Sequence, residues 1–165
     1  MIRGVGGHER GGRTGFAVAL ALAVTMISVG AATPALAQQA ADNDREAIRE
    51  VVLGAYVSGI HGNGDRGVIR AGFHPGFVMK VLRADGTMTD VTIEDWIARL
   101  PEEGTAPANP VRGEVPTVML SGNAAVAEVA IYRDGAQIFT DYISLYRFPE
   151  GWRMVAKVYY AHPGG

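Results

Sequence analysis

The chain has 165 residues, 48% of them hydrophobic, and a formal net charge of −2, which is enough apolar content for one buried core. It has no cysteine, which excludes disulfides, thiol nucleophiles and thiolate metal ligands. Lys80 and Lys157 are its only lysines, and the slight acidic excess leaves no basic stripe of the kind that binds nucleic acid.

Residues 1–37 have the pattern of a Sec signal peptide. Three arginines, Arg3, Arg10 and Arg13, precede an uncharged run over residues 16–32, and Ala35-Leu36-Ala37 has the small-residue spacing of a cleavage site. The run is shorter than the roughly 20 apolar residues of a transmembrane helix, so an uncleaved anchor is the weaker alternative. We therefore expect an exported protein, periplasmic or secreted, with no stable membrane anchor after cleavage and a single domain over residues 38–165.

The mature chain is predicted to begin with two helices. Apolar residues recur at helical spacing over residues 45–60, and Asn43 and Asp44 can cap the N-terminus of this first helix. Asp65 can cap a second, short helix over residues 66–71. Glycines between the two segments predict that the first helix ends near residue 61.

Two short strands and a third helix are predicted next. The strands cover residues 77–82 and 87–91 and are joined by a turn at Asp85-Gly86. Thr92 and Asp95 can cap the third helix, which carries Trp96, Ile97 and Leu100. Residues 101–113 contain three prolines and little periodicity, so we expect a surface linker there.

The last third of the chain predicts four antiparallel strands over residues 115–162. Three tight turns separate them, at Gly122-Asn123, Asp134-Gly135 and Pro149-Glu150-Gly151. Helices first and an antiparallel meander last are typical of an α+β fold, with one curved sheet wrapped over the helices.

These elements resemble the nuclear transport factor 2-like superfamily and, within it, the family called putative lumazine-binding proteins. The residues that carry the resemblance are 48–56, Asp65, 73–75, 93–96, 139–145 and 151–159, and the likeness covers residues 44–162. It implies a cone of N-terminal helices packed on a curved, mainly antiparallel sheet, with a pocket between them, and often a homodimer packed through the sheet. Relatives include enzymes and binding proteins, so it implies no single activity.

Counting residues across the predicted hairpins places charged side chains on the sheet. A two-residue turn at Asp134-Gly135 would put Glu128 opposite Asp141. A three-residue loop over residues 149–151 would put Asp141 opposite Tyr159. A slip of one residue in either hairpin would move these side chains to opposite faces.

The same arithmetic predicts one polar patch, formed by Glu128, Asp141, Lys157 and Tyr159, on an otherwise apolar face. Two opposed carboxylates require a cation or a shared proton, and Lys157, diagonal to Asp141, can supply the cation. We expect this patch to line the pocket, with Lys157 holding a polar group of a ligand. The alternatives are a structural salt bridge and a solvated or dimer-facing surface.

Aromatic side chains add to the candidate pocket. Tyr56, Phe73, Trp96 and Tyr159 could stack against a flat ligand, although core packing explains Phe73 and Trp96 equally well. The candidate ligand-binding residues are therefore Tyr56, Trp96, Glu128, Asp141, Lys157 and Tyr159. We expect no metal site, because His61, His74 and His162 lack short ligand spacing, and we expect no cofactor.

Two functions compete, and a binding module for a small, partly apolar ligand is favoured. Isomerases of the superfamily that this chain resembles use a tyrosine on the first helix and an aspartate on the first strand. Tyr56 matches the tyrosine, but the aspartate position falls at Lys80 or Val81, which cannot act as that base. The alternative is an isomerase- or dehydratase-like enzyme with Asp141 or Glu128 as base. A weaker third hypothesis is a dimerising interaction domain.

Overall fold

The computed structural model describes residues 34–163. The uncharged run of the expected signal peptide, residues 16–32, lies outside the described residues. The expected cleavage site, residues 35–37, lies in the exposed first turn of helix α1 (Pro34–Val51). Within residues 34–163, no helix combines the length and the apolar character needed to cross a membrane.

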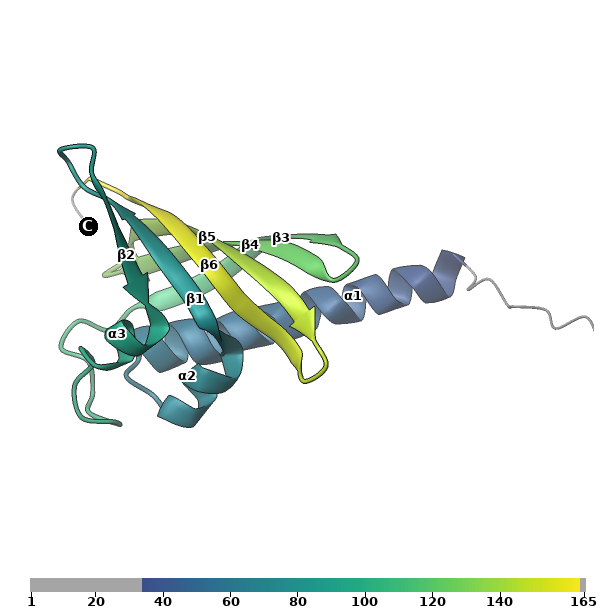
Figure 1. Cartoon of the computed structure of the whole chain (residues 1–165), viewed down its shortest axis with the longest axis horizontal. Helices are drawn as coiled ribbons and strands as arrows, with labels where there is room; N and C mark the ends of the chain where they lie inside the picture. Colours follow the sequence, from purple (N-terminus) through teal and green to yellow (C-terminus); the bar gives the residue numbers. More distant parts are fainter. Residues whose placement is uncertain (1–33, 164–165) are drawn as a thin grey trace, which may run out of the picture. The chain divides into compact units, whose positions relative to one another are not determined.

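The elements follow the predicted order: helices at the start, two strands, another helix and four final strands (Figure 1). Helix α1 continues directly into a π-helix, η1 (Val52–His61). The other elements are α2 (Arg66–Gly72), β1 (Phe73–Leu82), β2 (Met88–Thr92), α3 (Ile93–Ile97), β3 (Arg112–Ser121), β4 (Ala124–Arg133), β5 (Ala136–Phe148) and β6 (Gly151–Ala161). The strands form one sheet in the order β2-β1-β6-β5-β4-β3, in which only the β1–β6 pair is parallel.

The first helix begins at Pro34 rather than at residue 45, so the predicted caps are wrong. Asn43 and Asp44 lie inside α1, where side-chain bonds four residues apart, such as Gln39 to Asn43, support the helix. Asp44 is buried and accepts hydrogen bonds from Arg147 and from Nε1 of Trp152, at 3.3 Å in the second case. Its carboxylate therefore fastens α1 to the sheet.

The other predicted helix starts are confirmed. Asp65 accepts a hydrogen bond from the Val68 amide at 2.8 Å and caps α2, and Thr92 accepts one from the Asp95 amide at 3.1 Å and caps α3. The first strand starts earlier than predicted, at Phe73, because the parallel pairing with β6 already begins there.

The register between β4 and β5 differs from the prediction by one residue. The turn has the expected positive φ angles, 51° at Asp134 and 83° at Gly135. A bulge just beyond it adds a residue to β5, and Glu128 therefore pairs with Tyr142 rather than with Asp141. The predicted opposition of Glu128 and Asp141 is wrong.

The register between β5 and β6 differs from the prediction next to the loop and agrees with it beyond a bulge in β6. The loop has only Pro149 and Glu150, so that Phe148 pairs with Gly151. A bulge farther along β6 restores the offset, and Asp141 pairs with Tyr159 as predicted.

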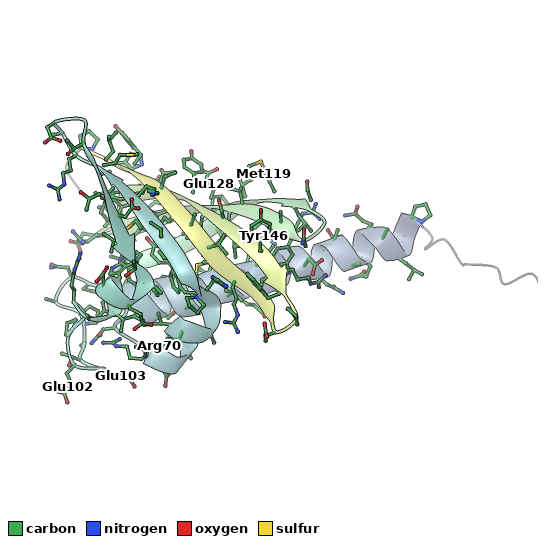
Figure 2. The ribbon with its side chains drawn as sticks, viewed as in Figure 1. Arg70, Glu102, Glu103, Met119, Glu128 and Tyr146 are labelled. Carbon is green, nitrogen blue, oxygen red and sulfur yellow. The ribbon has the colours of Figure 1, made fainter. Side chains whose placement is uncertain are left out.

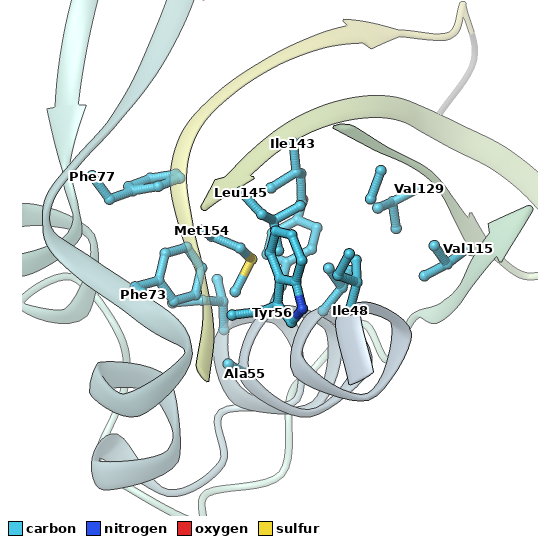
Figure 3. Close-up of a cluster of buried hydrophobic side chains, with 14 of the residues drawn as sticks. Ile48, Ala55, Tyr56, Phe73, Phe77, Val115, Val129, Ile143, Leu145 and Met154 are labelled. Atoms are coloured by element: carbon cyan, nitrogen blue, oxygen red, sulfur yellow. The ribbon is translucent and has the colours of Figure 1, made fainter. Parts of the chain in front are cut away.

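The hydrophobic core lies between the helices and the inner face of the sheet (Figure 3). Its largest fully buried apolar side chains include Phe73, Phe77, Ile143, Leu145 and Met154. The opposite, outer face of the sheet carries exposed apolar side chains instead, among them Met119, Tyr142, Tyr146, Val158 and Tyr160.

Candidate functional site

Three buried polar side chains meet beneath η1. The hydroxyl of Tyr56 donates a hydrogen bond to Oδ2 of Asp141 at 2.6 Å, and Nζ of Lys157 donates one to Oη of Tyr56 at 2.5 Å. Nζ also lies 2.7 Å from Oδ1 of Asp141. The side chains of Lys157 and Asp141 are 5% and 0% exposed, so this ion pair is withdrawn from solvent. We call the three residues the buried triad.

The sheet register and the π-helix together assemble this site. Ile143 pairs with Lys157, which places Lys157 diagonal to Asp141 on the inner face. In η1 the hydrogen bonds run between residues five apart, as from the Gly62 amide to the Val57 carbonyl at 2.9 Å. Residues five apart in an α-helix would point about 140° apart.

The five-residue spacing of η1 brings the rings of Tyr56 and His61 to one side, with centroids 4.8 Å apart. Neither the π-helix nor this contact of His61 with Tyr56 was predicted from the sequence. The available signal is the pair Gly54 and Gly59, which lowers the α-helical preference of an otherwise apolar segment.

A cavity of about 200 Å³ adjoins the triad. Its lining is mainly aromatic and consists of Tyr56, His61, Met79, Trp96, Phe139, Lys157 and Tyr159. The volume corresponds to roughly seven water molecules at about 30 Å³ each, so it suits a compact ligand.

Aromatic rings surround the ammonium group of Lys157. Its Nζ lies 4.6 Å from the ring centroid of Tyr56, 5.3 Å from that of Trp96 and 5.0 Å from that of Tyr159. Such distances are within the range of cation–π attraction, which partly replaces the water that the ammonium has lost.

Burial controls the protonation of the triad. Burial, reinforced by the negative charge of Asp141, raises the pKa of Tyr56 well above its ordinary value, so Tyr56 keeps its proton and remains a donor. Burial lowers the pKa of Lys157, and the charge and hydrogen bonding of Asp141 oppose that effect.

His61 is a neutral imidazole at neutral pH. Burial, followed by the positive charges of Lys157 and Arg133, lowers its pKa to about 4. Its Nε2 is buried and has no hydrogen-bond partner within residues 34–163. Oδ1 of Asp141 also receives no well-directed hydrogen bond in this part of the chain, so its 2.7 Å contact with Nζ is electrostatic. Both atoms are enclosed by protein.

Four of the six candidate residues line the cavity: Tyr56, Trp96, Lys157 and Tyr159. Asp141 lies behind them, fully buried against Tyr56 and Lys157. Glu128 does not join the patch, because the bulge in β5 turns it to the outer face with Met119 and Tyr146 (Figure 2). His61, Met79 and Phe139 complete the lining and were not among the candidates.

The three histidines of the described chain stay apart. His74 stacks on Phe148 with centroids 4.8 Å apart, and His162 forms a hydrogen bond of 2.9 Å with Thr140. Within residues 34–163, no group of three or more His, Cys, Asp or Glu side chains is placed to hold a metal ion.

The fold is nuclear transport factor 2-like, as shown by its similarity to solved structures. A nuclear transport factor 2-like protein of unknown function from Shewanella baltica matches with a TM-score of 0.62 and 22% identity, over 74% of this chain and 97% of that one. Another, from Silicibacter pomeroyi, matches with a TM-score of 0.58 and 21% identity, over 76% and 98%. A nuclear transport factor 2-like protein with a cystatin-like fold, from Novosphingobium aromaticivorans, matches with a TM-score of 0.52 and 17% identity, over 78% of this chain and 88% of that one.

The family can be stated more narrowly. Residues 43–160 match the family described as "Putative lumazine-binding", and the chain belongs to this family. The match extends from the middle of α1 almost to the end of β6 and therefore includes the whole triad and its cavity. No curated protein matches the chain.

Proposed function

We propose that this is an exported protein that binds a small, flat, partly apolar molecule in the cavity beside Lys157. The observation that carries the proposal is a mainly aromatic cavity of about 200 Å³ with a buried ammonium group in its wall. Ligand sites in proteins are typically concave and apolar, with few polar groups that fix orientation. The description of the family as lumazine-binding also favours a small-molecule ligand.

The charges around the cavity favour a neutral ligand over an ion. Asp141 compensates the charge of Lys157, and His61 is neutral, so a charged ligand would be buried without a counter-ion. Burying an uncompensated charge costs several kcal/mol, on the order of the desolvation penalty of one ion.

The polar contacts favour a ligand with a carbonyl or hydroxyl oxygen. An ammonium has three N–H donors, of which one goes to Tyr56 and one faces Asp141, leaving the third for a ligand. The rings of Trp96 and Tyr159 supply flat apolar surfaces for the rest of the molecule.

Native mass spectrometry of the protein purified from its own source tests this proposal. We expect a subunit mass that matches residues 38–165 and a discrete small adduct. Met79→Trp should fill the cavity and remove the adduct, whereas Met88→Trp, on exposed β2, should keep it. An adduct that persists in Met79→Trp would place the ligand elsewhere. A bare wild-type protein that also fails to bind added flat carbonyl compounds would contradict the proposal.

The geometry gives less support to the isomerase or dehydratase alternative. Glu128 lies on the outer face of the sheet, away from the cavity. Asp141 is fully buried, with one oxygen bonded to Tyr56 and the other beside Lys157. A general base must reach the proton that it removes, and neither carboxylate is placed to do so directly.

We further propose that the protein forms a homodimer through the outer face of the sheet. Met119, Tyr142, Tyr146, Val158 and Tyr160 are each 47–61% exposed there. An apolar patch of this kind usually marks an interface. Light scattering should give twice the subunit mass, and Tyr142→Arg should halve it, whereas Leu82→Arg, at the exposed end of β1, should not. A monomeric wild type would contradict the proposal.

A further inference from the structure

The triad forms a directed chain of two short hydrogen bonds. Lys157 donates to Tyr56 at 2.5 Å, and Tyr56 donates to Asp141 at 2.6 Å. A proton can therefore pass from Nζ to Oη while the phenolic proton passes to Oδ2, and Tyr56 is neutral before and after. The transfer converts the ammonium–carboxylate pair into an amine and a carboxylic acid.

Burial makes this neutral form accessible. Removing an ion pair from water destabilises both charged partners, so the charged and neutral forms lie closer in free energy than they do in solvent. Asp141 is 0% exposed and Lys157 is 5% exposed, and the pKa of Lys157 is lowered mainly by burial. The outcome is a potential amine nucleophile in the wall of an aromatic cavity.

We infer that Lys157 forms a reversible imine with a small aldehyde or ketone bound in this cavity. The inference deepens the proposed function and rests on it, because the same cavity must first admit the carbonyl compound. It assigns the ligand class as compact carbonyl compounds with a flat apolar body. The proton chain of the triad would then serve to produce the neutral amine of Lys157.

The step balances without an oxidant or a reductant. The neutral amine of Lys157 attacks the carbonyl carbon, an N–C bond forms, and the π electrons of the carbonyl move to its oxygen. The resulting carbinolamine breaks its C–O bond, and the oxygen leaves as water with the two hydrogens of the amine. The proton held by Asp141 returns through Tyr56 to the imine nitrogen. Ammonium plus carbonyl compound thus becomes protonated imine plus water, and Asp141 keeps a cationic partner.

The chain carries its own matched control. Lys80 is the only other lysine of the sequence, and its Nζ also contacts an aspartate, Asp90, at 2.7 Å. Its side chain is 45% exposed, so its ammonium is hydrated, whereas that of Lys157 is withdrawn from water. Selective reaction of Lys157 would therefore reflect the buried site and not lysine chemistry in general.

Reductive trapping tests the inference on the full protein. Benzaldehyde and sodium cyanoborohydride, which reduces iminium ions in preference to aldehydes, should convert an imine into a stable secondary amine that peptide mass spectrometry locates. We expect Lys157 to be labelled about tenfold or more faster than Lys80, because the proton chain of the triad supplies a neutral amine beside the cavity. Lys80→Arg should keep the fast labelling, and in Lys157→Arg only the slow labelling of Lys80 should remain. Equal labelling of both lysines would overturn the inference.

A second probe separates this inference from the proposed function. Benzyl alcohol has the shape of benzaldehyde but no carbonyl, and its binding can be followed by the emission of Trp96 in a Trp152→Phe background. Binding of benzyl alcohol without trapping at Lys157 would overturn the imine and leave the binding function standing. Failure of both probes would overturn both.

Tyr56→Phe keeps Lys157 but removes the hydroxyl that relays its proton to Asp141. It therefore tests the proton relay even if Lys157→Arg folds poorly. Its trapping rate, normalised to occupancy by benzyl alcohol, should fall about tenfold, and a higher pH should restore it because more amine is then neutral. An unchanged normalised rate would show that Lys157 reacts without help from Tyr56 and would overturn the role given to the triad.

Discussion

Lys80 and Lys157 each lie 2.7 Å from an aspartate oxygen, yet the two ion pairs occupy opposite environments. Lys80 and Asp90 face each other across the β1–β2 hairpin, with side chains 45% and 55% exposed. Lys157 and Asp141 lie diagonally on β6 and β5 under η1, and are 5% and 0% exposed. Both pairs join a lysine to an aspartate at the same distance, but Lys157 is buried and also hydrogen-bonded to Tyr56, so the two pairs differ in their environment.

Removing one partner of the exposed pair should change the free energy of unfolding little, because water then solvates the remaining charge. Such exposed pairs contribute about 0–1 kcal/mol. In the buried pair, each ion is the main compensation for the other. Removing one partner leaves a charge in an apolar interior, which costs about 3–5 kcal/mol. The buried pair therefore adds little net stability, but neither Lys157 nor Asp141 can be replaced alone without a large loss of stability.

The largest expected effect comes from breaking the buried pair. Lys157→Met should lower the free energy of unfolding by about 3–5 kcal/mol, because Asp141 is left buried without a cation. Urea denaturation followed by circular dichroism measures the change. Lys80→Met, the same substitution in the exposed pair, should change it by at most about 1 kcal/mol.

A double variant sharpens this first prediction. Lys157→Met with Asp141→Leu replaces the whole pair by apolar side chains, and such replacements are often neutral or stabilising by about 1–4 kcal/mol. We therefore expect it to recover most of the stability that Lys157→Met loses. If Lys157→Met alone is as stable as the wild type, Asp141 is already protonated in the folded protein and the ion pair does not exist.

The proximity of Asp141 and Lys157 was predicted from the sequence, but the bulges and the π-helix around them were not. Alternation and turn residues were sufficient to pair Asp141 with Tyr159, although a shorter loop and a bulge on β6 had to cancel. The bulge on β5 had no such compensation, and it moved Glu128 to the outer face. A bulge is a response to sheet curvature and packing, so turn chemistry alone does not reveal it.

The π-helix was hidden for a related reason. Apolar residues recur every three or four positions through residues 45–60, which fits an α-helix as well as it fits the observed join of α1 and η1. The difference lies in which carbonyl each amide reaches, and packing against the sheet decides that. The contact of His61 with Tyr56 was therefore not predicted, while Tyr56 was found from its place on the apolar face.

The next largest effect is a pH dependence from His61. Its pKa is about 4 in the folded protein and 6.5 in the unfolded chain, so the unfolded chain binds the proton more tightly. Stability from the neutral imidazole is complete above pH 6.5 and declines as the pH falls toward 4, by about 3 kcal/mol in total. Lys157 and Arg133 supply the positive charges that oppose protonation, and Tyr56 packs against the ring.

His61→Gln should remove this dependence. The measurement is the difference in unfolding free energy between wild type and His61→Gln from pH 7 to pH 4, which cancels the titration of the carboxylates common to both. We expect the advantage of the wild type to shrink steadily over this interval. A difference that does not vary with pH would mean that His61 titrates normally and is in contact with solvent.

A smaller effect is expected from the hydroxyl that joins the pair. Tyr56→Phe removes the donor to Asp141 and the acceptor of Lys157, and a hydrogen bond to a charged group contributes about 1.5–3 kcal/mol. Urea denaturation should show a loss in this range. Tyr142→Phe, on the outer face, is the matched control and should be nearly neutral. Equal effects of the two variants would mean that the hydroxyl does not bridge the ion pair.

The smallest effect belongs to the exposed pair, and salt distinguishes it from the buried one. The coupling between Lys80 and Asp90, measured by a double-mutant cycle with Lys80→Met and Asp90→Asn, should be below about 1 kcal/mol and should vanish near 1 M salt, where the Debye length is about 3 Å. The cost of Lys157→Met should persist in the same salt, because mobile ions do not reach a buried pair. If salt abolished that cost as well, solvent would reach Lys157 freely, and its amine would be no more reactive toward a carbonyl ligand than that of Lys80.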